Sequence, residues 1–393
     1  MSAVISTLGL ILLGLVGHLL LWIEFVNHVH ATRMPRWGVW WLTLLGYGFL
    51  AMAPAAIALA MTLGWLTPPT RSVADWPAAL QFYGGLCVAV AVVLAPLAVA
   101  HRWPTPLKNV QILGAAHRDL GKELGLAIVG GSTGRLMNSV RGNQALQLEV
   151  TRKTLEIPRL PPELDGLTIC HLTDLHYTGR IPRAFFDEVM REANALQPDL
   201  MLMTGDLVDK APCIDWIAPT LGALQAPHGC FYILGNHDKR VPIDQVRDVL
   251  ANQGWTSLSG RTQLITVRGA TILLAGNELP WLPPAANMRQ ALHPDERPHL
   301  RLLLSHSPDQ IAWARAYRFD LMLSGHNHGG QIVLPWIGPV AAPSRYGVKY
   351  AGGVYYEPPT LLHVSRGISA ELPLRLNCPP ELALLELLRG AAG

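Results

Sequence analysis

The chain has 393 residues, enough for more than one domain, and 50% of them are apolar. Only 15% are charged, against about 25% in an ordinary soluble domain. The formal net charge is +3, which argues against a nucleic-acid-binding protein, because such a protein carries a strong basic bias. The five cysteines are irregularly spaced and form no CxxC pair. This pattern favours buried free thiols in a reducing compartment over disulfides or a zinc knuckle.

The shortage of charge is concentrated in residues 1–100, where three runs contain no charged side chain: 3–23, 38–66 and 76–100. A helix of about 20 apolar residues spans the roughly 30 Å hydrocarbon core of a bilayer. These runs are apolar all round rather than along one stripe, which is untypical of a soluble helix. We therefore predict a transmembrane region of three helices. Tryptophans suited to the membrane interface lie near the ends of the runs: Trp22, Trp37, Trp40, Trp41, Trp65 and Trp76.

The basic residues that flank these runs predict the orientation in the membrane. Arg33 and Arg36 follow the first run, whereas only Arg71 separates the second run from the third. Four further basic residues follow the third run: Arg102, Lys108, Arg118 and Lys122. Because cytoplasmic flanks are enriched in Lys and Arg, we expect the N-terminus outside and the large C-terminal part in the cytoplasm. This predicts a multi-pass protein of the inner (cytoplasmic) membrane.

Residues 101–160 are predicted to be a linker with a strand leading into the next domain. The pattern predicts a surface helix over residues 117–129 and a strand over residues 146–157. The glycines between them do not form a phosphate-binding P-loop, because no GK[ST] follows them. We place the second domain at residues 161–393.

Within residues 161–393, five predicted strands end directly at side chains that can bind metals. The strands cover residues 167–172, 199–203, 230–234, 300–304 and 320–323, and they are followed by TDLH, TGDLVD, GNHD, SHSPD and GHNHGGQ. A further strand is predicted over residues 271–275, and helices over 182–196, 241–253 and 309–317. In α/β sheets, metals and substrates collect just beyond the carboxyl ends of strands.

This set of side chains suits the hydrolysis of a phosphate ester. Two metal ions about 3.5–4 Å apart can share a hydroxide nucleophile and neutralise the phosphoryl oxygens. Such a site needs a carboxylate that bridges the ions and a mixed oxygen and nitrogen shell around each. Imidazole and carboxylate ligands accept Mn, Fe, Zn or Ni, so the ligands leave the identity of the two divalent ions open.

The series DLH, GDLVD, GNHD, SH and GHNHGGQ resembles the calcineurin-like metallophosphoesterase superfamily, from about Leu167 to the C-terminus. The resemblance implies a four-layer α/β sandwich, in which two mixed β-sheets are flanked by helices, here preceded by three transmembrane helices. It also implies a first metal held by Asp174, His176 and His328, and a second held by Asn236, His306 and His326. Asp206 would bridge the two ions.

Two further residues are candidates for catalytic roles. The resemblance implies that His237, next to Asn236, points at the leaving-group oxygen and acts as general acid or charged stabiliser. Asp209 follows the bridging Asp206 by three residues. An acid at this place orients the catalytic histidine in the phosphoprotein-phosphatase branch, although capping a helix N-terminus is an equal alternative for Asp209.

The tail, with QIVLPWIGPV, PSRYGVKYAGG and HVSRGI, resembles the branch that includes the bacterial YkuE- and YaeI-like phosphodiesterases. Some relatives in that wider group cleave the pyrophosphate of UDP-diacylglucosamine. Substrate contacts or ordinary surface and salt-bridge roles are open for Arg345, Tyr346, Lys349 and Arg366.

We therefore expect a membrane-anchored hydrolase of a phosphodiester, pyrophosphate or phosphomonoester, including a lipid-linked one, that uses a hydroxide bridging two metal ions. Its expected partners are the lipid bilayer and the phosphate ester, with no nucleic acid. One alternative is a membrane-tethered phosphoprotein phosphatase. The other is a phosphate or metal sensor without turnover, against which the complete ligand set argues.

Overall fold

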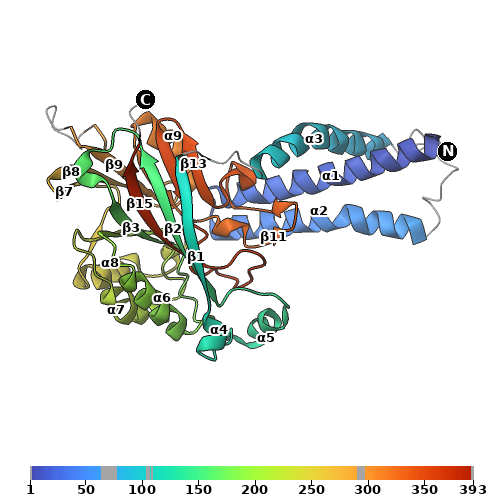
Figure 1. Ribbon diagram of the computed structural model, residues 1–393. Helices are drawn as coiled ribbons and strands as arrows, with labels where there is room; N and C mark the ends of the chain where they lie inside the picture. Colours follow the sequence, from blue (N-terminus) through green and yellow to red (C-terminus); the bar gives the residue numbers. More distant parts are fainter. Residues whose placement is uncertain (1, 63–77, 103–106, 108, 290–296, 391–393) are drawn as a thin grey trace. The chain divides into compact units, whose positions relative to one another are not determined.

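A computed structural model describes residues 2–62, 78–102, 107, 109–289 and 297–390 (Figure 1). The chain divides into two compact units. Residues 1–104 and 343–349 form the first, and residues 105–342 and 350–393 form the second.

The first unit contains three long apolar helices: α1 (Ser2–His30), α2 (Arg36–Thr62) and α3 (Ala78–Arg102). The three segments long and apolar enough to cross a membrane are Gly9–His30, Arg36–Ala56 and Ala78–Leu97. The three predicted apolar helices are therefore confirmed. Parts of the predicted runs lie outside the described residues: 63–66 and 76–77, with Trp65 and Trp76, and also Arg71 between the runs.

Helix α1 packs closely against α3 at Gly17. A Cβ atom at Gly17 would lie 1.7 Å from the carbonyl oxygen of Cys87, so only glycine permits this approach. At the next residue, Nδ1 of His18 lies 2.5 Å from the hydroxyl of Tyr83 on α3. Nε2 of His18 lies 3.3 Å from the carbonyl oxygen of Leu50 on α2. This histidine thus connects all three helices by hydrogen bonds, which bilayer-spanning helices use for association.

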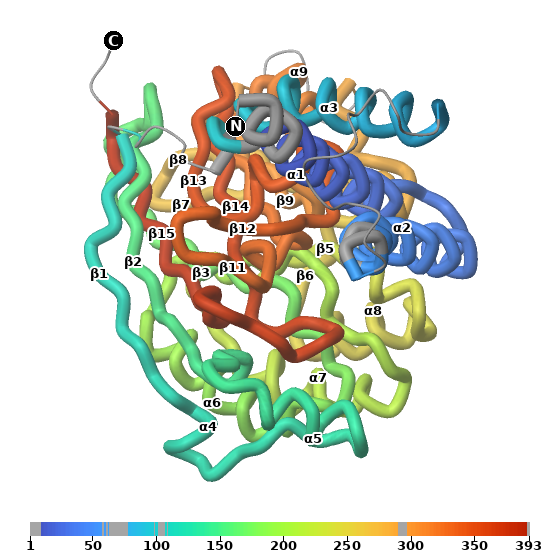
Figure 2. The backbone as a smooth tube through the Cα atoms, turned by 90° about the vertical axis from the view of Figure 1, so that its right-hand side faces the viewer, coloured from blue at the N-terminus to red at the C-terminus, as the bar shows by residue number. Residues whose placement is uncertain are grey.

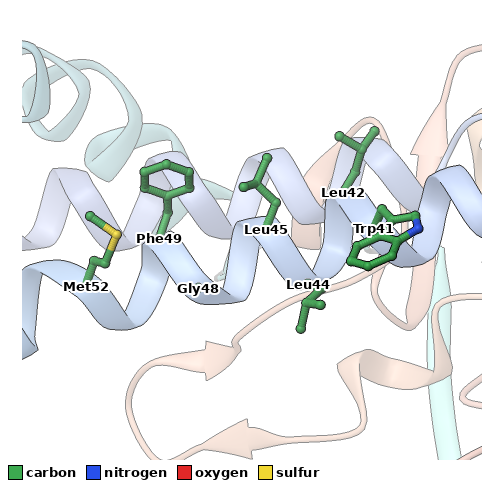
Figure 3. A pocket seen from close by; sticks show the side chains of 7 residues that line it. All are labelled: Trp41, Leu42, Leu44, Leu45, Gly48, Phe49 and Met52. Carbon is green, nitrogen blue, oxygen red and sulfur yellow. The ribbon is translucent and has the colours of Figure 1, made fainter.

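The outer side of α2 is apolar and exposed, as expected for a helix in contact with lipid. An apolar hollow of about 640 Å³ runs along it (Figure 3). Its lining comes from this one helix: Trp41, Leu42, Leu44, Leu45, Gly48, Phe49 and Met52.

The second unit contains a seven-stranded mixed sheet in the order β1-β2-β15-β3-β4-β5-β6. The bounds are β1 (Val110–Asp119), β2 (Gln147–Ile157), β15 (Glu381–Arg389), β3 (Leu167–Leu172), β4 (Leu200–Thr204), β5 (Cys230–Ile233) and β6 (Trp255–Ser257). Figure 2 shows β1, β2 and β15 side by side. β15 pairs parallel to β2 and antiparallel to β3, so the last strand in the chain lies in the middle of the sheet.

A six-stranded mixed sheet has the order β13-β14-β10-β9-β8-β7. Its strands are β13 (Gly353–Glu357), β14 (Thr360–Val364), β10 (Leu321–Ser324), β9 (Leu300–Ser305), β8 (Ala270–Asn277) and β7 (Thr262–Val267). A separate hairpin pairs β11 (Val333–Leu334) with β12 (Gly338–Pro339).

Side chains of alternating strand residues fill two separate apolar cores. Leu200 and Leu202 of β4 join a core that also contains Leu302 of β9 and Leu323 of β10, so this core lies between the sheets. The intervening Met201 and Met203 join a core with the helices α6 (Arg183–Ala195), α7 (Ile217–Thr220) and α8 (Ile243–Asn252). Helix α9 (Ile311–Ala316) contacts β14 of the other sheet. The predicted fold, two mixed sheets flanked by helices, is confirmed.

The segment predicted to be a linker contributes two strands to the seven-stranded sheet. The strand predicted over residues 146–157 is β2, but the helix predicted over residues 117–129 is wrong apart from one short turn, α4 (Leu120–Glu123). The reason is that His117 pairs in register with Glu149 as part of β1, and the carboxylate of Asp119 then caps α4 through the N–H of Lys122. Helix α5 (Gly131–Ser139) follows.

Candidate metal centre

The candidate ligands lie on loops at the carboxyl ends of five strands. Asp174 and His176 follow β3, Asp206 follows β4, and Asn236 follows β5. His306 follows β9, while His326 and His328 follow β10. β3, β4 and β5 are mutually parallel, as are β9 and β10, so each sheet delivers its ligands at one edge.

Most of these ligand residues adopt a backbone conformation that non-glycine residues rarely use. Positive φ angles occur at Asp174 (54°), His176 (44°), Asp206 (54°), His326 (69°) and His328 (51°). Each such residue costs on the order of 1 kcal/mol, and residues of this kind cluster at functional sites. The tight loops turn the side chains back toward a common centre instead of out to solvent.

Two glycines permit the loops to approach each other. A Cβ atom at Gly235 would lie 2.2 Å from Oδ1 of Asp206, and a Cβ atom at Gly325 would lie 2.2 Å from Oδ2 of Asp174. Neither position could carry any other residue without displacing a candidate ligand.

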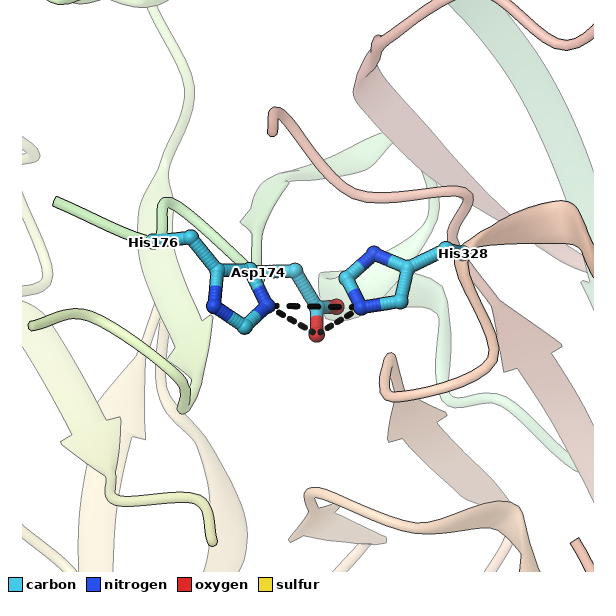
Figure 4. A group of neighbouring side chains, drawn as sticks. All are labelled: Asp174, His176 and His328. Atoms are coloured by element: carbon cyan, nitrogen blue, oxygen red, sulfur yellow. Dashed lines mark hydrogen bonds and ion pairs between the residues drawn. The ribbon is translucent and has the colours of Figure 1, made fainter. Parts of the chain in front are cut away.

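A first group consists of Asp174, His176 and His328 (Figure 4). The carboxylate of Asp174 points between the two imidazole rings. Its Oδ1 lies 3.8 Å from Nε2 of His176 and 3.6 Å from Nε2 of His328. The two Nε2 atoms are 3.3 Å apart. Facing imidazole nitrogens beside a carboxylate form a donor set that suits a divalent cation.

A second group consists of the buried side chains Asp206, His306 and His326. Nε2 of His306 lies 3.2 Å from Oδ2 of Asp206 and 3.1 Å from Oδ1 of Asn236, so the predicted amide ligand joins this group. Nδ1 of His306 donates to the carbonyl oxygen of Thr204 at 2.8 Å. That hydrogen bond leaves Nε2 as the nitrogen turned toward the carboxylate and the amide, as in metal-binding histidines.

Asp206 lies between the two groups. Its Oδ2 is 3.6 Å from Nε2 of His176 and 3.2 Å from Nε2 of His306. Its Oδ1 accepts the backbone N–H of His237 at 2.8 Å, which fixes the orientation of the carboxylate. All seven predicted ligands are thus brought together, and this one carboxylate faces both groups.

The carboxylates change the protonation of the buried histidines. Burial alone lowers the pKa of His176, but the charge of Asp209 and its hydrogen bond outweigh burial and raise that pKa to about 9. Burial likewise lowers the pKa of His306, and Asp206 raises it to about 9. The same histidine charges hold the pKa of Asp206 well below its usual range despite burial. The centre therefore attracts positive charge strongly, and divalent cations would take the place of these protons.

Asp209 contacts two histidines with its two oxygens. Oδ2 accepts Nδ1–H of His176 at 2.7 Å, and Oδ1 accepts Nδ1–H of His237. Oδ1 also accepts from Arg240 at 2.8 Å. The side chain of Asp209 thus contacts His237, as one of its two predicted roles requires. The other predicted role was a helix cap, but no capping hydrogen bond links this side chain to the short helical segment that begins at Ala211.

Four residues near the centre were not singled out from the sequence. Arg240 lies beside His237 and forms an ion pair with Glu371 at 2.9 Å. Trp281 packs on His326, with ring centroids 4.7 Å apart. The buried Asp238 accepts the N–H groups of Leu207, Val208 and Gly235 and so connects two ligand loops. Trp281 follows the end of β8, so the rule of strand ends would have indicated it.

The four basic and aromatic residues of the tail lie in different places. Arg366 belongs to the second unit, and its guanidinium pairs with Glu149, which corresponds to the predicted salt-bridge alternative. Arg345, Tyr346 and Lys349 belong to the segment 343–349, which clusters with the helical unit.

Comparison with known proteins places these motifs in a family. The model of the calcineurin-like phosphoesterases matches residues 167–330. The metallophosphoesterase YkuE of Bacillus subtilis is 30% identical over 259 residues, which cover 61% of this chain and 85% of the relative. Phosphodiesterase YaeI of Escherichia coli is 31% identical over 228 residues, 56% of this chain and 81% of the relative. UDP-2,3-diacylglucosamine pyrophosphatase LpxG of Chlamydia trachomatis is 29% identical over 294 residues, 61% of this chain and 89% of the relative.

Proposed function

The chain belongs to the calcineurin-like metallophosphoesterase family, and we propose that it is a membrane-anchored hydrolase of phosphodiester or pyrophosphate bonds that works with two divalent metal ions. The observation that supports the metal pair best is the position of Asp206, whose Oδ2 lies within 3.6 Å of His176 and 3.2 Å of His306. Asp174, His176 and His328 would hold one ion, and Asn236, His306 and His326 the other. Asp206 would contact both.

The bound ions would supply a nucleophile that is available at neutral pH and positive charge for the phosphoryl oxygens. The protein contributes the remaining groups. His237 donates Nδ1–H to Asp209, so its Nε2 is the ring nitrogen that faces the centre, 4.0 Å from Oδ2 of Asp206. We assign His237 the role of protonating or stabilising the leaving-group oxygen, and Asp209 the role of fixing its ring.

We further propose that the substrate is lipid-linked. Three candidate membrane spans in the same chain keep the catalytic unit at a bilayer, where lipid-linked phosphates are concentrated. One relative is named a UDP-2,3-diacylglucosamine pyrophosphatase, and another a phosphodiesterase. A pyrophosphate or phosphodiester that joins a polar group to a lipid fits both observations.

The proposed location is the inner membrane, with the catalytic unit on the cytoplasmic side. Support comes from the basic flank of α1, where Arg33 and Arg36 lie. Five free, buried cysteines agree with a reducing compartment. Protease digestion of right-side-out and inverted vesicles tests this orientation: only the inverted vesicles should release fragments of the catalytic unit.

The central test is a substrate screen with manganese-loaded full-length protein in detergent, next to the variants Asp206→Asn and His237→Ala. We expect Asp206→Asn to lose bound metal and activity together. We expect His237→Ala to keep its metal and lose turnover by about 10²- to 10⁴-fold. Wild-type rates in both variants would show that the assigned centre is wrong.

The same screen separates the alternatives. Hydrolysis of phosphopeptides without hydrolysis of lipid-linked phosphates would favour a phosphoprotein phosphatase. Binding of phosphate without hydrolysis of bis(p-nitrophenyl) phosphate, in protein with its full metal content, would favour a sensor.

A further inference from the structure

The hairpin formed by β11 and β12 ends in an exposed apolar tip, residues 334–337. Trp336 is 90% exposed, more than any other large apolar residue among those described. Its neighbours Ile337 and Leu334 are 51% and 39% exposed. The remaining tip residue is Pro335, so the whole tip offers no charge to water. Apolar surface gathered at one projecting point marks an interaction site.

The tip is also held in an unfavourable conformation. The N–H of Ile337 donates to the carbonyl oxygen of Leu334 at 3.2 Å and closes the turn. Within this turn, Trp336 has a φ of 59°, where glycine or asparagine would be the ordinary choice. Both the positive φ angle of Trp336 and the exposure of its apolar ring to water lower the stability of the isolated domain. Binding of this tryptophan to a partner outside the domain would account for its presence here.

The base of the hairpin is fixed, so the tip projects as a rigid element. The N–H of Val333 donates to Leu376 at 2.9 Å, and the side-chain amide of Asn377 donates back to Val333 at 2.9 Å. The N–H of Leu376 in turn donates to Gln331 at 2.9 Å. Because the tip is already ordered, binding through it costs little further conformational entropy.

We propose that the tip residues 334–337 insert into the interfacial layer of the lipid bilayer. The bilayer is the occupant that the chain itself indicates, since the same chain carries three candidate membrane spans. Tryptophan is the residue that favours the membrane–water interface, where its ring is apolar and its indole N–H meets water. No charged side chain occurs between His328 and Arg345, so insertion of the tip would bury no charge.

Insertion would fix the distance between the metal centre and the membrane. The hairpin directly continues the loop that carries His328, and the N–H of Gln331 donates to the carbonyl oxygen of His328 at 3.1 Å. The eight residue-to-residue steps from His328 to Trp336 span at most roughly 29 Å. The headgroup of a lipid could therefore approach the centre from the bilayer surface. This consequence rests on the proposed function, whereas insertion itself does not.

The test uses the full-length protein in nanodiscs, with a thiol-reactive fluorophore at Ile337→Cys. The five native cysteines are buried, so the introduced thiol is the accessible one. Leu264→Cys on β7, another exposed apolar position of the same unit, is the matched control. We expect the emission at position 337 to shift to shorter wavelength and to be quenched by lipids brominated near the headgroup, with no comparable change at position 264.

Each other outcome overturns the proposal. Equal quenching at both positions would mean that the tip is not the inserted element. A shift without quenching would mean that protein, rather than lipid, covers the tip.

A second variant, Trp336→Ser, links the tip to catalysis. We expect it to raise the KM for a phosphodiester embedded in vesicles about tenfold, because less apolar surface is buried at the interface. The rate with water-soluble bis(p-nitrophenyl) phosphate should stay at the wild-type value. Failure of the proposed function would abolish both rates in the wild-type protein and leave the quenching result intact.

Discussion

Oδ2 of Asp209 lies 2.7 Å from Nδ1 of His176, a residue of the first metal-binding group. The other oxygen of the same carboxylate holds His237. One side chain therefore orients both a proposed metal ligand and the proposed catalytic histidine. Burial raises the pKa of Asp209, but the positive charges of His176 and His237 outweigh burial and hold this pKa far below its usual range. The carboxylate is therefore charged at neutral pH.

We expect Asp209→Asn to weaken metal binding and turnover together. The amide cannot accept from both imidazoles as the carboxylate does, so His176 loses the partner that orients its ring. Loss of such a partner lowers metal affinity by about 10- to 100-fold. Metal content measured by mass spectrometry, together with the rate on bis(p-nitrophenyl) phosphate, checks this. Full metal content with reduced turnover would contradict a role of Asp209 in metal binding and leave only its role in orienting His237.

We expect Arg240→Gln to keep the metal and lose activity. Arg240 contacts the oxygen of Asp209 that faces His237, and its Nη2 lies 3.3 Å from Nε2 of His237. Removing this positive charge from beside the proposed catalytic histidine should lower kcat/KM about tenfold. Arg247→Gln, which removes a guanidinium paired with Asp244 on α8, is the control and should leave kcat/KM unchanged. A parallel loss of metal in Arg240→Gln would contradict this division of roles.

We expect Gly325→Ala to reduce occupancy of the first metal group. The added methyl carbon would lie 2.1 Å from Oγ1 of Thr173 and 2.2 Å from Oδ2 of Asp174, so the carboxylate must move. The domain should lose about 1–3 kcal/mol of stability through this overpacking. Gly114→Ala on β1 meets open space and serves as the control. Metal content and melting temperature are the measurements, and unchanged metal binding in Gly325→Ala would refute the expectation.

A buried ion pair in the seven-stranded sheet predicts how stability depends on pH. Nζ of Lys153 lies 2.7 Å from Oε1 of Glu381, and both side chains are buried. Burial raises the pKa of Glu381, but the charges of Lys153 and Arg366 outweigh burial and hold the pKa well below its usual range. Below the ordinary pKa of 4.5, the unfolded chain takes up a proton that the folded chain refuses. The free energy of unfolding should therefore be greatest above pH 4.5 and fall on further acidification.

Glu381→Gln tests this directly. The variant leaves the charge of Lys153 buried and should cost about 3–5 kcal/mol at neutral pH. Its stability should also respond less to acid, because the carboxylate that drives the response is gone. Denaturant unfolding followed by tryptophan fluorescence at several pH values is the measurement. Glu386→Gln, half-buried on the same strand, is the control. Identical acid slopes in Glu381→Gln and the wild-type chain would contradict the assignment.

The positions of the candidate ligands could be predicted from the sequence because each follows a short, apolar strand. β3 was predicted at its observed bounds, and β4, β5, β9 and β10 within one residue at either end. The carboxyl ends of parallel strands meet at one edge, so residues as distant in sequence as Asp174 and Asn236 are expected to meet. The local sequence pattern is sufficient for these ligands because each of them occupies the same kind of position, the loop after the carboxyl end of a strand.

Features that depend on pairing between distant segments could not be predicted in the same way. β1 carries seven exposed residues in succession and lies at the edge of the sheet, so its periodicity does not indicate a strand. The bond between Asp209 and His176 also joins separate loops, and the sequence indicated only the partnership with His237. Trp281 follows a strand end and could have been noted for that reason, but nothing in the local sequence indicates that its ring packs on His326.

The central position of β15 has a consequence for synthesis of the protein. β2 and β3 leave the ribosome long before Glu381–Arg389, yet they meet only through that strand. Until Glu381–Arg389 has been translated, both halves of the sheet therefore expose unpaired backbone, a state in which nascent chains are prone to aggregate. A stop codon ahead of position 381 would leave two sheet fragments that no remaining segment can join.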